Sequence, residues 1–280
     1  MILVADSGST KTDWRLINDK TEVLACSTMG FNPYFVDSAV VLKELSASIL
    51  AVKKEEVEEV FFYGAGCSSA EKQTFLAAIF AQFFTNANIT VAHDLLAAAR
   101  AACKNESGLV AILGTGANTC LFNGKDITHN IPALGYILGD EGGGVHLGKL
   151  FIKKLLHGQL SDKVSTDFKH TFPELNLNTI LDKVYKQALP NRFLASFAQF
   201  ILKHENETEI NAIIHQSFHE FFKQYIVMYP NYQQYPLHIV GSIGFYFQKH
   251  IAFVAKDYGV VIGKVVQQPI NELVEFHLKY

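Results

Sequence analysis

The sequence predicts an α/β protein made of two related domains. Short apolar runs alternate with helical patterns along the chain, which is typical of α/β proteins. Three β-rich runs separated by polar turns open the sequence, and the same pattern starts again at Gly108. Gly8 and Gly116 occupy matching places in the two first turns, 116 − 8 = 108 positions apart. We therefore expect a duplicated β-β-β-α-β-α-β-α unit.

The first domain is expected to span residues 1–107. Its helix over 70–84 carries one apolar stripe, which we expect to pack in the core. Ser68 with Glu71 fits a capping box at the start of this helix. The expected strands cover 2–5, 14–17, 23–26, 60–63 and 89–91, and the expected helices cover 38–50, 70–84 and 95–103.

The second domain is expected to span residues 108–268, with a helical insertion after Gly144. No low-complexity linker separates it from the first domain. The expected strands cover 109–113, 120–122, a run through Ile131, 237–240 and 260–265. The expected helices cover 147–156, 177–188, 193–203, 209–228, a segment ending near 253, and 270–278.

Composition excludes several classes of protein. Among the 280 residues, Lys and Arg number 24 and Asp and Glu 27, a net charge of −3, so the chain lacks the basic excess that coating a nucleic acid requires. With 49% hydrophobic and 18% charged residues it is not a disordered chain. No run reaches the ~18–20 apolar residues of a membrane helix, and the N-terminus does not read as a signal peptide. A cytoplasmic protein without a membrane partner is expected.

The four cysteines form no C-x-x-C pair, which argues against zinc and favours buried, reduced thiols.

The polar segment D6-S-G-S-T-K-T-D13 lies between the first two strands. Such a turn can wrap phosphate oxygens with N–H groups and hydroxyls, while Asp6 holds Mg²⁺ directly or through water. An ordinary polar hairpin is the alternative, and a Walker A motif is absent. The candidate nucleotide-binding residues of this turn are Gly8, Ser9, Thr10 and Lys11.

Two later turns have the same character. G114-T-G-A-N-T119 again joins two strands and offers Gly114, Thr115 and Gly116, and I239-V-G-S-I-G244 offers Gly241 and Ser242 where a strand meets a helix. The spacing of these turns resembles the fold family of sugar kinases, actin and the chaperone ATPases. That resemblance implies two ribonuclease-H-like domains that close on ATP, and a C-terminal helix, 269–280, that packs on the first domain.

Asp94 lies in V91-A-H-D-L-L96, at the end of a strand or the first turn of a helix. In the sugar kinases of that family the corresponding aspartate is the general base. A helix N-cap is the alternative role for an aspartate here, and His93 beside it reads as structural.

The segment G135-Y-I-L-G-D-E-G-G-G144 resembles the G-D-E-G signature of N-acetylglucosamine kinases and the related BadF/BadG/BcrA/BcrD ATPase family. The resemblance implies that Thr10 and Thr115 contact the phosphates and Ser242 the nucleoside. The chain departs from the family at Leu134, where a tryptophan is expected, and in G-G-G for G-S-A, which leaves the exact sugar open. The residues that the likeness assigns to the sugar are Asn32, Ala133, Leu134, Gly135 and Asp140.

Together these features predict ATP-dependent phosphorylation of the primary hydroxyl of an amino sugar, with N-acetylglucosamine as the first candidate. One alternative is the family's other branch, an ATPase that activates a 2-hydroxyacyl-CoA dehydratase through an iron–sulfur cluster. No cysteine follows Cys120, so the ligand expected near the G-D-E-G motif is missing. The other alternative is a non-catalytic sugar or nucleotide sensor. The sequence is compatible with a homodimer and does not determine the oligomeric state.

Overall fold

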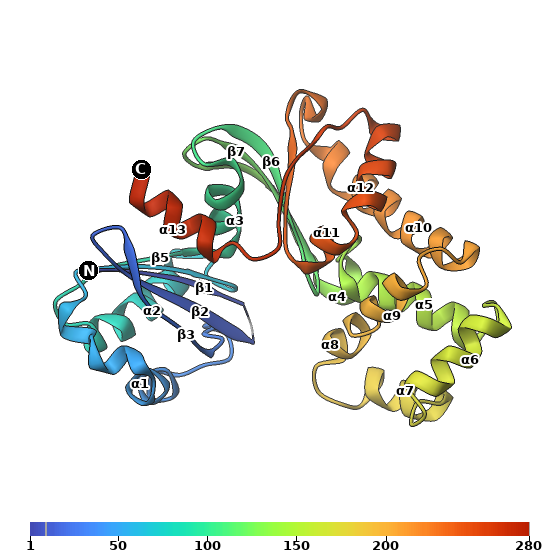
Figure 1. The fold of residues 1–280 in the computed structure, drawn as a ribbon, viewed down its shortest axis with the longest axis horizontal. Coiled ribbons are helices and arrows are strands. Elements are labelled where there is room, and N and C mark those ends of the chain that lie inside the picture. Colours follow the sequence, from blue (N-terminus) through green and yellow to red (C-terminus); the bar gives the residue numbers. More distant parts are fainter. Residues whose placement is uncertain (9, 280) are drawn as a thin grey trace. The chain divides into compact units, whose positions relative to one another are not determined.

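The computed structural model describes residues 1–8 and 10–279, which form two compact units. Unit 1 contains Met1–Lys104 and the C-terminal stretch from Gln268, and unit 2 contains Asn105–Gln267. Each unit has a five-stranded sheet with helices packed against it (Figure 1).

The sheet of unit 1 has the order β3-β2-β1-β4-β5. Strands β1, β2 and β3 pair antiparallel, whereas β4 and β5 run parallel to β1, so the carboxyl ends of β1, β4 and β5 share one edge. The strands are β1 (Ile2–Ser7), β2 (Lys11–Asn18), β3 (Thr21–Met29), β4 (Glu59–Gly64) and β5 (Asn88–His93).

Different helices pack on the two faces of this sheet. Leu3 and Trp14 belong to a core with residues of α1 and α2, where the Trp14, Phe62 and Phe80 rings pack together. Val4 belongs to a second core, shared with α3 and α13. The alternation follows from the twofold period of side chains along a strand. The helices are α1 (Ser38–Ala47), η1 (Ile49–Val52), η2 (Lys54–Glu56), α2 (Ala70–Phe83), α3 (Asp94–Cys103) and α13 (Ile270–Lys279).

The C-terminal helix α13 lies beside α3 (Figure 1). Ile270 and Leu273 are buried in their shared core, and Lys104 forms ion pairs with Glu272 and Glu275. Buried apolar contact supplies most of the stability of such docking, because partly exposed ion pairs contribute little.

The sheet of unit 2 repeats the topology of unit 1. Its order is β10-β9-β6-β7-β8, with β6, β7 and β8 antiparallel and β9 and β10 parallel to β6. The predicted duplicated α/β fold is therefore confirmed. The strands are β6 (Ser107–Leu113), β7 (Ala117–Asn123), β8 (Ile127–Ile131), β9 (Leu237–Val240) and β10 (Ile262–Val266).

Helices between β8 and β9 build most of the core of unit 2. Phe151, Phe168, Phe197 and Phe200 meet there as a cluster of rings. The helices of unit 2 are α4 (Gly135–Leu138), α5 (Gly144–Leu156), α6 (Asp162–Thr171), α7 (Leu177–Tyr185), α8 (Pro190–Ala195), α9 (Ala198–Lys203), α10 (Thr208–Gln224), η3 (Ile226–Met228), η4 (Tyr232–Gln234), α11 (Ser242–Tyr246), α12 (Gln248–Ala255) and η5 (Lys256–Tyr258).

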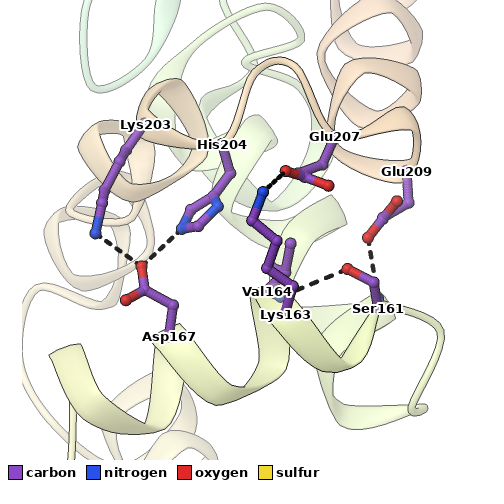
Figure 2. A network of polar contacts seen from close by, with 8 residues as sticks. All are labelled: Ser161, Lys163, Val164, Asp167, Lys203, His204, Glu207 and Glu209. Atoms are coloured by element: carbon purple, nitrogen blue, oxygen red, sulfur yellow. Dashed lines mark hydrogen bonds and ion pairs between the residues drawn. The ribbon is translucent and has the colours of Figure 1, made fainter.

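Polar contacts join α6 to α9 and to the start of α10 at the surface (Figure 2). The Asp167 carboxylate accepts hydrogen bonds from Lys203 and from His204, each at 2.8 Å, and Lys163 pairs with Glu207. His204 is buried and packs on Phe200. These contacts orient the insertion rather than stabilise it strongly, because both lysines are exposed and both carboxylates are partly exposed.

Several helix boundaries differ from those that the sequence predicts. Ser69, not Ser68, caps α2, because its hydroxyl accepts the N–H of Lys72. The predicted helix over 209–228 ends at Gln224, and the one over 193–203 lies across a break between α8 and α9. The short helix α6 was missed because its sequence, D-K-V-S-T-D-F-K-H-T, is too polar to show a clear apolar stripe.

Among the helices of residues 1–8 and 10–279, none has both the length and the hydrophobicity needed to cross a bilayer.

Candidate active site

Asp6 and Asp94 lie at the shared edge where the parallel strands of unit 1 end. Asp6 is the next-to-last residue of β1 and pairs in register with Tyr63 of β4. Asp94 directly follows β5 and is the first residue of α3. In open α/β sheets, ligands bind at this carboxyl edge.

The carboxylate of Asp6 is in an unfavourable environment for a negative charge. Burial, with the nearby charges of Asp94 and Asp13, raises its pKa to about 7, against a smaller lowering effect of Lys11. A carboxylate crowded by two others is stabilised by a bound cation.

Unit 1 offers a carboxylate to a magnesium ion whose remaining ligands would be substrate phosphates and water. Mg²⁺ prefers oxygen donors and often takes only one or two protein carboxylates, together with substrate phosphates and water. The described residues contain no cluster of three or more His, Cys, Asp or Glu side chains placed to cage a metal. Asp6 would be the protein ligand, directly or through water.

The turn after Asp6 is closed by backbone hydrogen bonds. The N–H of Gly8 donates to the Lys11 carbonyl at 3.0 Å, and the Thr10 carbonyl accepts from the N–H of Gly30 at 3.0 Å. Gly8 and Thr10 are exposed, and the Lys11 ammonium pairs with Asp13 at 2.9 Å. Ser9, also predicted to bind nucleotide, lies outside the described residues.

Two buried hydroxyls that the sequence analysis missed connect this turn to Asn32. The Ser7 and Thr12 hydroxyls are 2.7 Å apart, and Ser7 Oγ accepts the N–H of Phe31 at 3.1 Å. Thr12 donates to the Met29 carbonyl. They fix the segment that carries Asn32, whose Oδ1 accepts the Tyr34 N–H and whose side chain is largely buried.

Asp94 has one buried carboxylate oxygen without a hydrogen bond among the described residues, Oδ1. His93 Nδ1 accepts the Leu95 N–H at 3.3 Å, and its Nε2 is 3.2 Å from Asp94 Oδ1. His93 therefore occupies the N-cap position of α3, and the alternative role of Asp94 as the cap is wrong.

The environment of Asp94 suits a proton acceptor. Burial raises its pKa, and this outweighs the lowering by His93 and by the Leu95 N–H. The side chain is 27% exposed although Oδ1 is inaccessible, so the exposure lies on its other atoms. A raised pKa brings a carboxylate closer to the range in which general bases work.

In unit 2, the turn between β6 and β7 presents N–H groups on one side. The carbonyls of Gly114 and Thr115 accept the N–H groups of Gly144 and Val145, at the start of α5, each at 2.9 Å. The C=O and N–H of a trans peptide point in opposite directions. The N–H groups of Thr115 and Gly116 therefore point away from α5, as an anion-binding turn requires.

Asp140 hydrogen-bonds to the end of the same turn. Its Oδ1 accepts the Ala117 N–H at 3.1 Å, and the residue is 9% exposed. Burial raises its pKa, although the Ala117 hydrogen bond and Lys149 act in the opposite direction. The loop that carries Asp140 thus packs directly on the turn.

We expect Gly116→Ala to destabilise the protein by about 1–3 kcal/mol, the usual cost of overpacking. A Cβ at Gly116 would lie 2.7 Å from Asp140 Oδ1. Gly114→Ala is the matched control, since a Cβ there meets no atom within 4 Å. Thermal unfolding of both variants checks this expectation, and equal melting temperatures would contradict it.

A cavity of about 320 Å³ opens beside this turn. Its polar lining includes Thr115 and Ser242 together with Ser196 and Gln199, and apolar residues on and beside α8, α9 and α11 line the rest, among them Tyr246 and Phe247. Gly241 has φ +114°, and a Cβ there would lie 2.5 Å from the Leu113 carbonyl, so β6 and the β9–α11 turn meet closely. The volume suits a small molecule such as a nucleoside.

The segment of unit 2 assigned to the sugar is open. Ala133, Leu134 and Gly135 are exposed, with Leu134 59% exposed at the start of α4. The structure thus brings Asp6, Lys11 and Asp94 together in unit 1. In unit 2 it brings Asp140 and the cavity lined by Ser242 to the turn between β6 and β7.

The family model of the BadF/BadG/BcrA/BcrD ATPase family matches residues 5–231, which is more than half of the chain. The chain belongs to this family. A solved structure of a Porphyromonas gingivalis protein assigned as an N-acetylglucosamine kinase is 37% identical, with a TM-score of 0.94 over 99% of this chain and 98% of the other.

Two further solved structures share the fold of this chain. A Chromobacterium violaceum protein, also assigned as an N-acetylglucosamine kinase, is 16% identical with a TM-score of 0.72 over 98% of each chain. A ROK family glucokinase from Streptomyces griseus, solved with glucose and AMPPNP, is 11% identical with a TM-score of 0.57 over 98% of this chain and 97% of the other. We found no match among curated proteins. The predicted family and the actin-like ATPase fold are confirmed.

Proposed function

We propose that this chain is an ATP-dependent sugar kinase that phosphorylates the primary hydroxyl of an amino sugar, with N-acetylglucosamine as the preferred substrate. The observation that carries the proposal is Asp94, a largely buried carboxylate with a raised pKa at the carboxyl edge of the sheet, in a chain of this ATPase family. The 37% identical P. gingivalis protein supports the choice of sugar.

The described groups divide the chemistry between the units. In unit 1, Asp94 would accept the proton of the attacking hydroxyl, and the Lys11 ammonium would neutralise developing charge. In unit 2, the N–H groups of Thr115 and Gly116 would bind phosphate oxygens, and the cavity lined by Ser242 and Tyr246 would take the nucleoside. Mg²⁺, held with Asp6, would stabilise negative charge on the phosphates.

The sugar contacts follow from the family likeness, with Asn32 in unit 1 and Ala133, Leu134, Gly135 and Asp140 in unit 2. An exposed leucine in place of a tryptophan offers less flat apolar surface to a sugar ring. We therefore expect N-acetylglucosamine to bind more weakly than it would to a site with tryptophan there. Since ATP is the donor, the reaction belongs in the cytoplasm.

A coupled ADP-release assay over a panel of sugars tests the proposal. We expect kcat/KM to be highest for N-acetylglucosamine and lower for N-acetylmannosamine, glucosamine, N-acetylmuramic acid and glucose. A sugar lacking the primary hydroxyl is the control, because it should bind without turnover. Absence of sugar-dependent ADP release at saturating MgATP would overturn the proposal, and sugar binding without turnover would indicate a sensor.

The alternative of an iron–sulfur activator has little support from the structure. Cys67, Cys103 and Cys120 are buried and Cys26 is only partly exposed, whereas a cluster shared by two subunits needs accessible thiolates. A brown chromophore in anaerobically purified protein would reverse this ranking.

A further inference from the structure

The hydroxyl of Tyr225, the residue that follows α10, contacts the G-D-E-G motif at Asp140. Its oxygen accepts the Asp140 N–H at 3.2 Å. Burial, together with the charges of Glu141 and Asp140, raises the pKa of Tyr225 to about 12, so the hydroxyl remains a donor. The side chain that caps the end of α10 thus holds the backbone of the motif at Asp140.

Asp140 needs such support because its backbone is in the left-handed region, with φ +65°. This region costs aspartate more than it costs glycine, although less than it costs most other residues, so hydrogen bonds from the surroundings help to hold Asp140 there. Tyr225 holds the Asp140 N–H, and the Ala117 N–H holds the Asp140 carboxylate. The two hydrogen bonds form a continuous path from α10 to the turn between β6 and β7.

We propose that Tyr225 is a positioning residue that, through Asp140, keeps the Gly114–Ala117 turn in the shape that binds nucleotide phosphates. Gly116 packs against the Asp140 carboxylate, so a shift of Asp140 moves the turn itself. This inference rests on the proposed binding of ATP, and it does not depend on the identity of the sugar. It also gives Asp140 a role toward the nucleotide, in addition to any contact with sugar.

Tyr229 provides a matched control on the same stretch of chain. It is as buried as Tyr225, and its hydroxyl also has two partners, Thr119 Oγ1 at 2.8 Å and the Ile131 N–H at 3.1 Å. It does not contact Asp140 in any hydrogen bond that the described residues make. Tyr225→Phe and Tyr229→Phe therefore each remove one buried hydroxyl, but only the first releases Asp140.

Calorimetric titration of both variants with MgAMPPNP, without sugar, tests the proposal. We expect Tyr225→Phe to weaken binding about tenfold, the loss that one hydrogen bond can produce, and Tyr229→Phe to change it by less than about twofold. Turnover with sugar should show a raised KM for ATP and nearly unchanged kcat in Tyr225→Phe. Equal affinities in the two variants would overturn the proposal.

Amide hydrogen exchange gives a readout that needs no ligand. Loss of the Tyr225 hydroxyl should speed exchange at the Ala117 N–H in the free protein, while Tyr229→Phe should leave that amide protected. Unchanged exchange at Ala117 in Tyr225→Phe would contradict the proposal. Failure of the proposed function appears instead as wild-type protein that releases no ADP with any sugar, so the two failures are distinguishable.

Discussion

Asp94→Asn is expected to lower sugar-dependent turnover by about 10²- to 10⁴-fold, because an amide cannot accept the proton that a general base removes. The shape of the side chain is kept, so affinity for MgAMPPNP should stay within about twofold of wild type. Steady-state ADP release and calorimetric titration measure the two effects separately.

The control for this substitution is Asp162→Asn. Asp162 is also an aspartate in the first turn of a helix, α6. It is exposed, and α6 contains none of the candidate site residues. It should retain full turnover, which would separate a loss at the site from a general loss of helix stabilisation. If Asp94→Asn kept wild-type turnover, Asp94 would not be the base.

Asp6→Asn is expected to abolish most activity and yet to stabilise the protein at alkaline pH. Burial raises the pKa of Asp6 from 3.8, its reference value, to about 7 in the folded chain. Between about pH 4 and pH 7 the folded state therefore keeps a proton that the unfolded state releases. The contribution of Asp6 to stability is therefore present at low pH and is lost as pH rises from about 4 to 7. Removing the charge should raise the free energy of unfolding at pH 8 by at most about 4 kcal/mol.

Thermal unfolding in EDTA at pH 4 and pH 8 checks the stability effect of Asp6→Asn. The gain should be larger at pH 8, while Asp126→Asn, in an exposed turn, should show no such difference. Turnover should fall by about 10²-fold or more, since a group that stabilises transition-state charge is lost. A variant that is less stable than wild type at pH 8 would contradict this account.

The order of most strands and helices could be predicted from the sequence because strands and helices have different periods of burial. The repeat of three strands followed by alternating helices and strands could be traced from the restart at Gly108, and the turns at Gly8, Gly116 and Gly241 marked the candidate site. Their glycines and hydroxyls stand next to each other in the chain, so the local pattern carries the signal.

Contacts distant in sequence could not be predicted in this way. Tyr225 meets Asp140 across 85 positions, and its place at the end of an apolar helix marks it only as core. Ser7 and Thr12 were overlooked because polar neighbours in the D-S-G-S-T-K-T run hide the alternation that turns both hydroxyls inward. The helix breaks at Ser196 and Tyr225 carry no glycine or proline that would have marked them in the sequence.

The position of α13 affects how the chain folds during synthesis. All of unit 2 leaves the ribosome while unit 1 still lacks the helix that covers α3, because Ile270 and Leu273 follow unit 2 in the chain. Domains usually fold in order from the N-terminus. Here the apolar face of unit 1 that α13 covers stays exposed until unit 2 has been synthesised, so unit 1 completes its packing only after unit 2 has been made.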